Sequence, residues 1–228
     1  MKLLRLEKLI LFACLTGIFS VSRASQDAVD QAVWSVAQNA QDLSFRQGTR
    51  QGEFASCELI YSYPYRDHRA YKGAPLIVRG SISSNLIQNK PFNYLLKVVP
   101  IRLVFDPKTK EFGHLVLAPE AASMKVNGQT MKPYLVQSFK CEDRGLCVGY
   151  AGKPTDAGLL LIMTSLDTVP FDAQIFFSAS KNGFDESFKL SDLKPEDPKK
   201  TNEQLRYEFS QCLLNLVQKQ MDSMDVKK

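Results

Sequence analysis

Short runs of apolar and β-branched residues recur from Cys57 to about Leu193, separated by turn-forming residues. Such runs predict strands, because strands are short and favour β-branched and aromatic side chains. The predicted strands are 57–63, 74–82, 94–105, 112–117, 122–126, 134–141, 147–150, 159–165, 173–180 and 184–190. Asn-Gly pairs at 127–128 and 182–183 predict tight hairpins between strands. The pattern predicts a mainly β domain over 25–193, an antiparallel β-sandwich or barrel.

Three stretches allow more than one interpretation. Pro100 interrupts the run 94–105, and because proline cannot donate to a ladder it indicates a sheet edge or a bulge there. Residues 159–163 could instead form a short helix, since periodicity cannot decide so short a run. Residues 25–43 have apolar side chains at helical spacing, but their central part, 32–37, could equally be a strand.

The chain changes character after residue 193. Residues 194–200 are charged, contain proline and predict a linker. Thr201 and Gln204 then form a capping-box pattern, which is typical of a helix start. Within 201–228, apolar residues recur at helical spacing at Leu205, Phe209, Cys212, Leu213, Leu216 and Val217, ahead of a polar tail. We expect this helix to pack on the sheet, because an unburied apolar face is costly; a partner-binding helix is the alternative.

Residues 1–24 have the pattern of a signal peptide. A basic start precedes the apolar run 9–21, and Ser22-Arg23-Ala24 is a small-x-small cleavage site. A membrane span needs about 20 apolar residues, so this run is too short. We expect cleavage after Ala24, a periplasmic or secreted protein, and no stable membrane span after the signal is removed. An uncleaved anchor or lipidation at Cys14 is the alternative.

The charge balance changes once the signal is removed. The whole chain has 29 basic and 24 acidic residues, a formal charge of +5. Residues 1–24 carry Lys2, Arg5, Lys8, Arg23 and Glu7, so the remainder has 25 basic and 23 acidic residues and a net charge of +2. No basic stripe remains, and nucleic-acid binding is therefore not expected.

All cysteines except Cys14 lie beyond residue 24, and an even number in an exported protein suggests disulfides. Cys141 and Cys147 flank a short polar turn with a glycine, so we expect them to bridge two paired strands. Cys57 and Cys212 are then left over. They either form a second bridge, tying the helix to the sheet, or stay as two separate buried thiols.

The sequence offers little catalytic chemistry. It contains two histidines, His68 and His114, and neither a phosphate-binding loop nor a nucleophile elbow. We expect no enzyme activity, no metal site and no cofactor. Interfaces favour tyrosine and arginine, so the best surface candidate is a cluster expected to bind a protein partner. Its members are Tyr61, Tyr63, Tyr65, Arg66, Arg69 and Tyr71. The alternative is an ordinary strand that runs into a loop.

Several motifs, in order, resemble the invasion-associated locus B family of secreted or periplasmic bacterial proteins. They are Trp34-Ser-Val36, Cys57-Glu-Leu-Ile60, Val126-Asn-Gly128, Phe139 with Cys141 and Cys147, Ala173-Gln-Ile-Phe-Phe177, and Gly183-Phe184. The chain departs from the family at Gln38, where the family has a cysteine that would bridge to Cys57. The segment before Tyr94 and the helix from Thr201 also exceed the family pattern.

The resemblance implies a β-sandwich-like domain associated with host-cell invasion, without an established catalytic mechanism. We therefore expect an exported, non-enzymatic protein that binds another protein in host-cell interaction. The alternative is a periplasmic accessory or structural component of an envelope assembly.

Overall fold

The computed structural model describes residues 28–67, 73–85, 92–106, 108–109, 111–117, 119–130, 135–142, 144–152, 162–179 and 186–225. The predicted signal peptide, the Asn182-Gly183 hairpin, His68, Arg69 and Tyr71 lie outside these residues. No helix among the described residues is long and apolar enough to cross a membrane.

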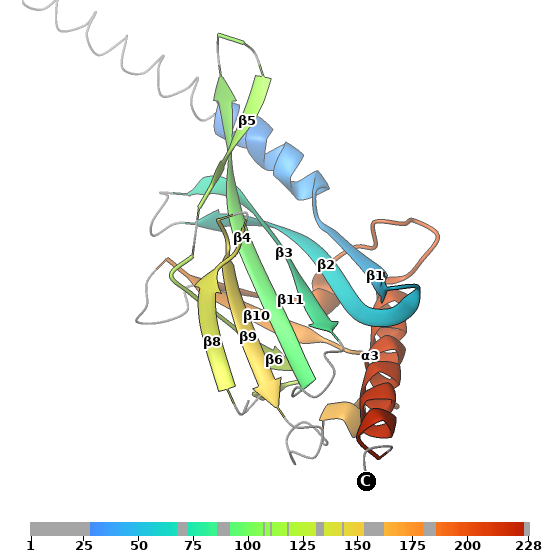
Figure 1. Cartoon of the computed structure of the whole chain (residues 1–228). Helices are drawn as coiled ribbons and strands as arrows, with labels where there is room; N and C mark the ends of the chain where they lie inside the picture. The colour runs from blue at the N-terminus through green and yellow to red at the C-terminus, as the bar shows by residue number, and fades with distance from the viewer. Residues whose placement is uncertain are drawn as a thin grey trace, which may run out of the picture.

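Two antiparallel sheets form the body of the protein (Figure 1). The larger sheet has the order β1-β2-β3-β4-β9-β8, and β5 pairs with the far part of β4. Its strands are β1 (Asp42–Arg50), β2 (Glu53–Asp67), β3 (Ala74–Asn85), β4 (Phe92–Asp106), β5 (Glu111–Val116), β8 (Leu135–Lys140) and β9 (Leu146–Gly152). The smaller sheet has the order β11-β10-β6-β7. Its strands are β6 (Ala121–Val126), β7 (Gln129–Thr130), β10 (Ala173–Ser178) and β11 (Glu186–Lys189).

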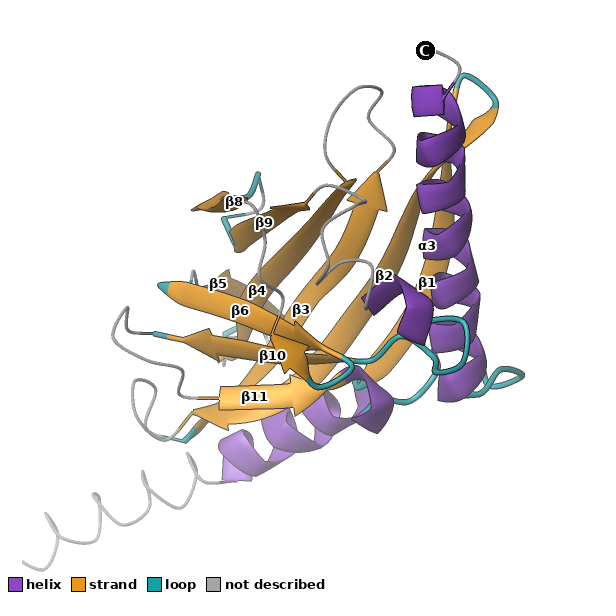
Figure 2. Cartoon of the chain, turned by 90° about the horizontal axis from the view of Figure 1, so that it is seen from below, coloured by secondary structure: helices purple, strands orange, loops and turns teal. Residues whose placement is uncertain are grey.

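The smaller sheet lies over one face of the larger sheet, and one core fills the space between them (Figure 2). Successive side chains of a strand point to opposite faces, so alternate residues of each strand enter this core. The larger sheet contributes Leu59, Tyr61, Val78, Ile82, Leu96 and Val98, and the smaller sheet contributes Met124, Ile175 and Phe188. This arrangement confirms the predicted antiparallel, mainly β fold.

The C-terminal helix α3 (Asn202–Asp225) packs against β1 and β2, as predicted (Figures 1 and 2). Its start is the predicted capping box: the Gln204 backbone N–H donates to Thr201 Oγ1 at 3.1 Å, and the Thr201 N–H donates to Gln204 Oε1 at 2.7 Å. The buried face of the helix consists of Leu205, Phe209, Cys212, Leu213 and Leu216. A 3-10 turn at Leu190–Asp192 and the segment 193–201 lead from β11 into this helix.

The N-terminal part of the domain resolves the ambiguity over 25–43. Residues 28–39 are helical, and the strand β1 follows directly. Val33 and Ala37 are buried, while Val36 on the same helix is exposed. The sheet therefore begins at Asp42, fifteen residues before the predicted start at Cys57.

Two other local predictions are corrected. The strand predicted over 159–165 is wrong where it is described, because residues 162–165 are helical, which fits the short-helix alternative. Pro100 lies inside β4, a central strand, and not at a sheet edge. On one side of β4, the partner changes from β9, which pairs up to Val98, to β5, which pairs from Ile101. A residue without an N–H fits this change of partner, because Pro100 only accepts there: the Leu117 N–H donates to its carbonyl at 2.8 Å.

The hairpin predicted at Asn127-Gly128 joins β6 to β7. Both residues have positive φ, 46° and 78°, as a tight turn of the primed type requires. Val126 and Gln129 pair on either side of the turn. This prediction is confirmed.

Candidate binding site

The tyrosines of the predicted Tyr/Arg cluster point into the protein. Tyr61 is buried, Tyr63 stacks on Phe188 with ring centroids 4.5 Å apart, and Tyr65 meets Phe177 edge-on at 5.6 Å. Burial raises the pKa of Tyr63, and nearby carboxylates raise it further. These rings join the larger sheet to the smaller sheet, so their contacts are structural.

Arg66 lies on the opposite face of β2 from these rings. Its guanidinium carbon is 4.7 Å from the centre of the Trp34 ring, in a cation–π contact with the N-terminal helix. The described members of the cluster therefore do not share one surface. Arg69 and Tyr71, the other predicted binding residues, lie outside the described residues.

The expected Cys141–Cys147 disulfide is present, and so is the Cys57–Cys212 bridge that the sequence left open. Cys141 and Cys147 close the turn between β8 and β9, with their Cα atoms 5.5 Å apart. Cys57 on β2 bridges to Cys212 on α3, with a Cα–Cα distance of 6.0 Å. The second bridge decides between the two alternatives that the sequence left open, and it ties the helix to the sheet.

The described residues contain no group of three or more His, Cys, Asp or Glu side chains that could hold a metal ion. His114 is exposed on β5 and lines neither of the hollows described below. Two buried tyrosine hydroxyls donate within the core, Tyr61 to the carbonyl of Lys97 and Tyr94 to the sulfur of Met163. Burial raises the pKa of both tyrosines, which keeps them protonated as structural donors.

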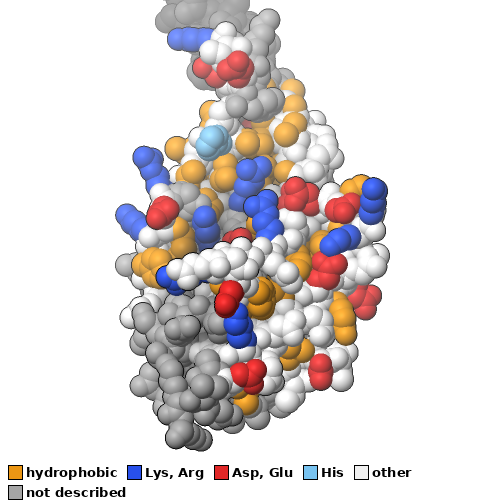
Figure 3. All heavy atoms as spheres, turned by 45° about the vertical axis from the view of Figure 1, so that its right-hand side comes forward, with side chains coloured by type: hydrophobic (Ala, Val, Ile, Leu, Met, Phe, Trp, Pro, Cys, Tyr) orange, Lys and Arg blue, Asp and Glu red, His pale blue; other side chains and the backbone are white. Residues whose placement is uncertain are grey.

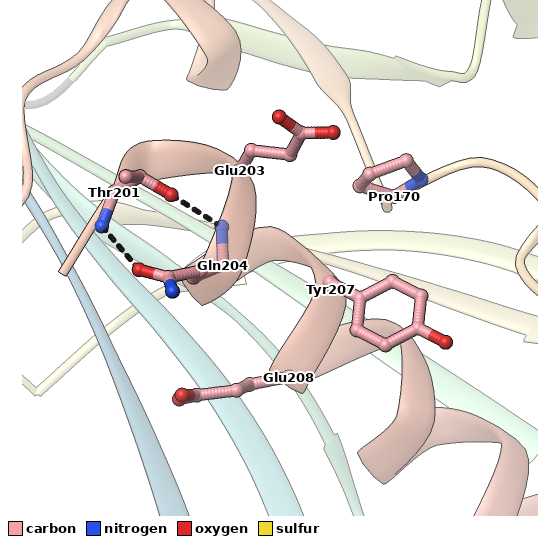
Figure 4. Close-up of a pocket in the computed structure, with 6 residues that line it drawn as sticks. All are labelled: Pro170, Thr201, Glu203, Gln204, Tyr207 and Glu208. Atoms are coloured by element: carbon pink, nitrogen blue, oxygen red, sulfur yellow. Dashed lines mark hydrogen bonds between the residues drawn. The ribbon is translucent and has the colours of Figure 1, made fainter.

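A groove of about 590 Å³ lies between α3 and the edge strand β1, and we call it the α3–β1 groove. It is lined by Phe45, Gln47, Lys200, Tyr207, Glu208, Gln211, Cys212 and Asn215. A smaller hollow of about 410 Å³ lies on the other side of the first turns of α3 and shares Tyr207 and Glu208 with the groove. Figure 4 shows the Tyr207 ring pointing to the side of Pro170 and Glu208 pointing the opposite way.

The charged groups at both ends of the α3–β1 groove are paired. The Lys200 ammonium donates to both carboxylate oxygens of Glu208, at 2.7 and 2.8 Å. One helical turn beyond Asn215, Lys219 donates to Glu53 at 3.0 Å and to the Phe54 carbonyl at 3.2 Å. These pairs neutralise one another, so the groove between them offers no net charge to a ligand.

Between these ion pairs the groove is lined by primary amides and aromatic rings. The side-chain amides of Gln47, Gln211 and Asn215 form no hydrogen bond with any described residue. Each amide carries both donors and an acceptor. The ring of Phe45 adds apolar area, and Tyr207, which also borders the groove, turns its ring to the side of Pro170. Uncharged polar groups beside aromatic rings are typical of surfaces that bind other proteins.

Over the face drawn in Figure 3, basic and acidic side chains are interspersed, and neither sign forms a continuous patch. This distribution agrees with the small net charge expected for the chain after residue 24.

Sequence reasoning missed the α3–β1 groove. One wall is β1, a strand that was not predicted, and the other wall is more than 150 residues away in the sequence. Comparison with protein-family models, with curated proteins and with solved structures gives no match. The function is therefore argued from the fold and from this groove.

Proposed function

We propose that this chain is an exported, non-enzymatic protein that binds another protein in the α3–β1 groove. The observation that carries the proposal is the lining of the groove. There, amides that no described residue bonds, and the ring of Phe45, lie between two neutralised ion pairs. Such a lining supplies hydrogen bonds and contact area without requiring a charged ligand.

The two disulfides support export. Disulfides form and persist in the periplasm and outside the cell, and they are rare in the cytosol. The Cys57–Cys212 bridge joins residues 155 positions apart in the sequence, so these two cysteines come together only when the chain is folded. The signal-peptide pattern of residues 1–24 supports the same compartment.

Host-cell interaction is the setting that we propose for this binding, on the basis of the motif order from Trp34 to Phe184. A stable place in a periplasmic assembly is the second setting. Fractionation of the producing cells separates them: released or surface-exposed protein supports the first, and strictly periplasmic protein in a stable complex supports the second.

Site-specific photocrosslinking in the producing cells tests the binding itself. A photoreactive phenylalanine analogue replaces Asn215 in the groove, and a matched variant carries it at Arg46, an exposed β1 residue on the opposite face of the sheet. We expect a crosslinked protein partner from the Asn215 position and none from Arg46. If neither Asn215 nor Gln211 gives a crosslinked partner in any fraction, the proposed function is wrong.

A further inference from the structure

The edge of β1 that faces away from β2 already forms main-chain hydrogen bonds with another part of the chain, at Leu43. The Leu43 N–H donates to the Lys194 carbonyl at 2.7 Å, and the Glu196 N–H donates to the Leu43 carbonyl at 2.9 Å. These two bonds form a parallel bridge between Leu43 and Pro195. The segment that leads into α3 therefore occupies the first position on this edge.

The next positions along the same edge have the same orientation. In an antiparallel pair, residues alternate between bonding to the partner strand and pointing away from it. The main-chain N–H and C=O of Leu43 point away from β2. The same groups of Phe45 and Gln47 therefore also point outward, up to the register shift that follows Gly48. Among the described residues, no main-chain group outside β2 bonds to Phe45 or Gln47.

The chain itself turns away before it reaches these groups. The carboxylate of Asp197 accepts a hydrogen bond from the Lys199 N–H at 2.9 Å, and its carbonyl accepts one from the Lys200 N–H at 3.1 Å. This turn directs the chain into α3. The open part of the β1 edge then lies at the α3–β1 groove, which Phe45, Gln47 and Lys200 all line.

Unpaired N–H and C=O groups on an edge strand are a template for a further strand. We propose that an extended segment of a protein partner adds to β1 at Phe45 and Gln47 and places alternate side chains in the α3–β1 groove. This inference rests on the proposed function and names its binding mode. The segment of the partner would pair with β1 next to residues 194–196, which already pair with Leu43.

The groove also defines the chemistry of this segment. The side chains of the segment meet the amides of Gln211 and Asn215 and the ring of Phe45, while Lys200 and Glu208 neutralise each other. The fitting segment is therefore uncharged, with polar or aromatic residues at alternate positions. Main-chain bonds supply affinity and the alternate side chains supply specificity, as in other strand additions.

Substitution at Gln47 tests the main-chain contact. Gln47→Pro removes the outward main-chain N–H. It breaks no hydrogen bond to β2, because the main-chain groups of Gln47 point away from that strand. Gln47→Ala removes the same side chain and keeps the N–H, so the difference between the two variants reports the change at the main-chain edge and not the loss of the side chain. The probe is a phage-displayed library of random linear decapeptides, selected on the disulfide-bonded protein and retested as synthetic peptides.

We expect selected peptides to bind Gln47→Pro at least about tenfold more weakly than Gln47→Ala, from the loss of one hydrogen bond and the crowding of the edge by the ring. Equal binding to the two variants overturns strand addition at β1. Failure to enrich any peptide also overturns it, while a crosslink from Asn215 would leave the proposed function standing.

Amide hydrogen exchange on the unmodified protein gives a second measurement that does not depend on how the proline variant folds. We expect the amide protons of Phe45 and Gln47 to exchange rapidly in the free protein and slowly once a selected peptide is bound. The amide of Arg46, which lies between them and faces β2, should change little. Unchanged exchange at both residues contradicts the proposal. If these amides become protected from exchange as the protein concentration rises, in the absence of peptide, then a second copy of the chain pairs with the β1 edge instead of a partner segment.

Discussion

Removing the Cys57–Cys212 disulfide should destabilise the protein more than removing Cys141–Cys147. Both bridges constrain the unfolded chain, and the constraint grows with the length of the closed loop. The sequence separations are 155 and 6 residues. In the chain-entropy treatment these loops correspond to about 5 and about 2 kcal/mol at 25 °C. The expected difference in the free energy of unfolding between the two double alanine variants is therefore about 3 kcal/mol.

The folded state of the C57A/C212A variant should keep α3 in place. Phe209, Leu213 and Leu216 remain buried against the sheets whether or not the bridge exists. Domains of this kind are stable by about 5–15 kcal/mol, so a variant that loses about 5 stays folded when the unmodified protein lies above the lower end of that range. Its far-UV circular dichroism before the unfolding transition should match that of the unmodified protein.

Urea unfolding under non-reducing conditions measures the effect, with C141A/C147A as the matched control. The m value of C57A/C212A should also rise, because its unfolded chain is no longer held in a large loop and exposes more surface. If C57A/C212A loses no more free energy of unfolding than C141A/C147A, loop closure is not what this bridge contributes, and the reasoning fails.

Three smaller perturbations test other parts of the structure. Ser210→Ala leaves the buried N–H of Phe171, which donates to the Ser210 hydroxyl at 2.6 Å, without an acceptor, so urea unfolding should show a loss of about 1–3 kcal/mol; a loss near zero would contradict this. Burial, with a further contribution from Glu196, raises the pKa of Asp42 above its ordinary value of 3.8, so the folded state disfavours the ionised carboxylate. Asp42→Asn should therefore raise the melting temperature at pH 7. The increase should shrink as the pH falls through the raised pKa of Asp42 towards 3.8. A lower melting temperature of the variant at pH 7 would refute this reasoning. Gly128→Ala places a side chain at a φ of 78° and should cost about 1–2 kcal/mol in the same urea assay, whereas an unchanged midpoint would argue against this turn.

Most strands could be predicted because their apolar residues form local patterns with turn residues between them. β1 could not, since only Leu43 is fully buried and the rest of the strand is largely polar. Its position depends on pairing with β2 and on the cover that α3 provides, and neither is a local property. The partner of Cys57 was left open for the same reason: nothing near either cysteine specifies a contact across 155 residues.

The Tyr/Arg cluster shows a different limit. Alternation along β2 places Tyr61, Tyr63 and Tyr65 on one face, and the structure agrees. The sequence does not reveal that Phe177 and Phe188 of the smaller sheet cover that face. A row of tyrosines has the same appearance in a sequence whether it meets solvent or a second sheet, and only the topology distinguishes the two.

The Cys57–Cys212 bridge connects stability to the α3–β1 groove. Gln47 lies opposite Cys57 in the β1–β2 ladder, and Cys212 lines the groove on the side of α3. The covalent bond therefore ties α3, one wall of the groove, to β2, the strand that pairs with the other wall β1. In the reduced chain, side-chain packing, the largely exposed Lys219–Glu53 ion pair and the hydrogen bond from Lys219 to the Phe54 carbonyl would still hold α3 to β2. Exposed ion pairs typically contribute less than about 1 kcal/mol, so the disulfide constrains the position of α3 more strongly than this ion pair does. Disulfide formation, which oxidising compartments favour, thus adds a covalent constraint to a helix that packing already holds beside β1.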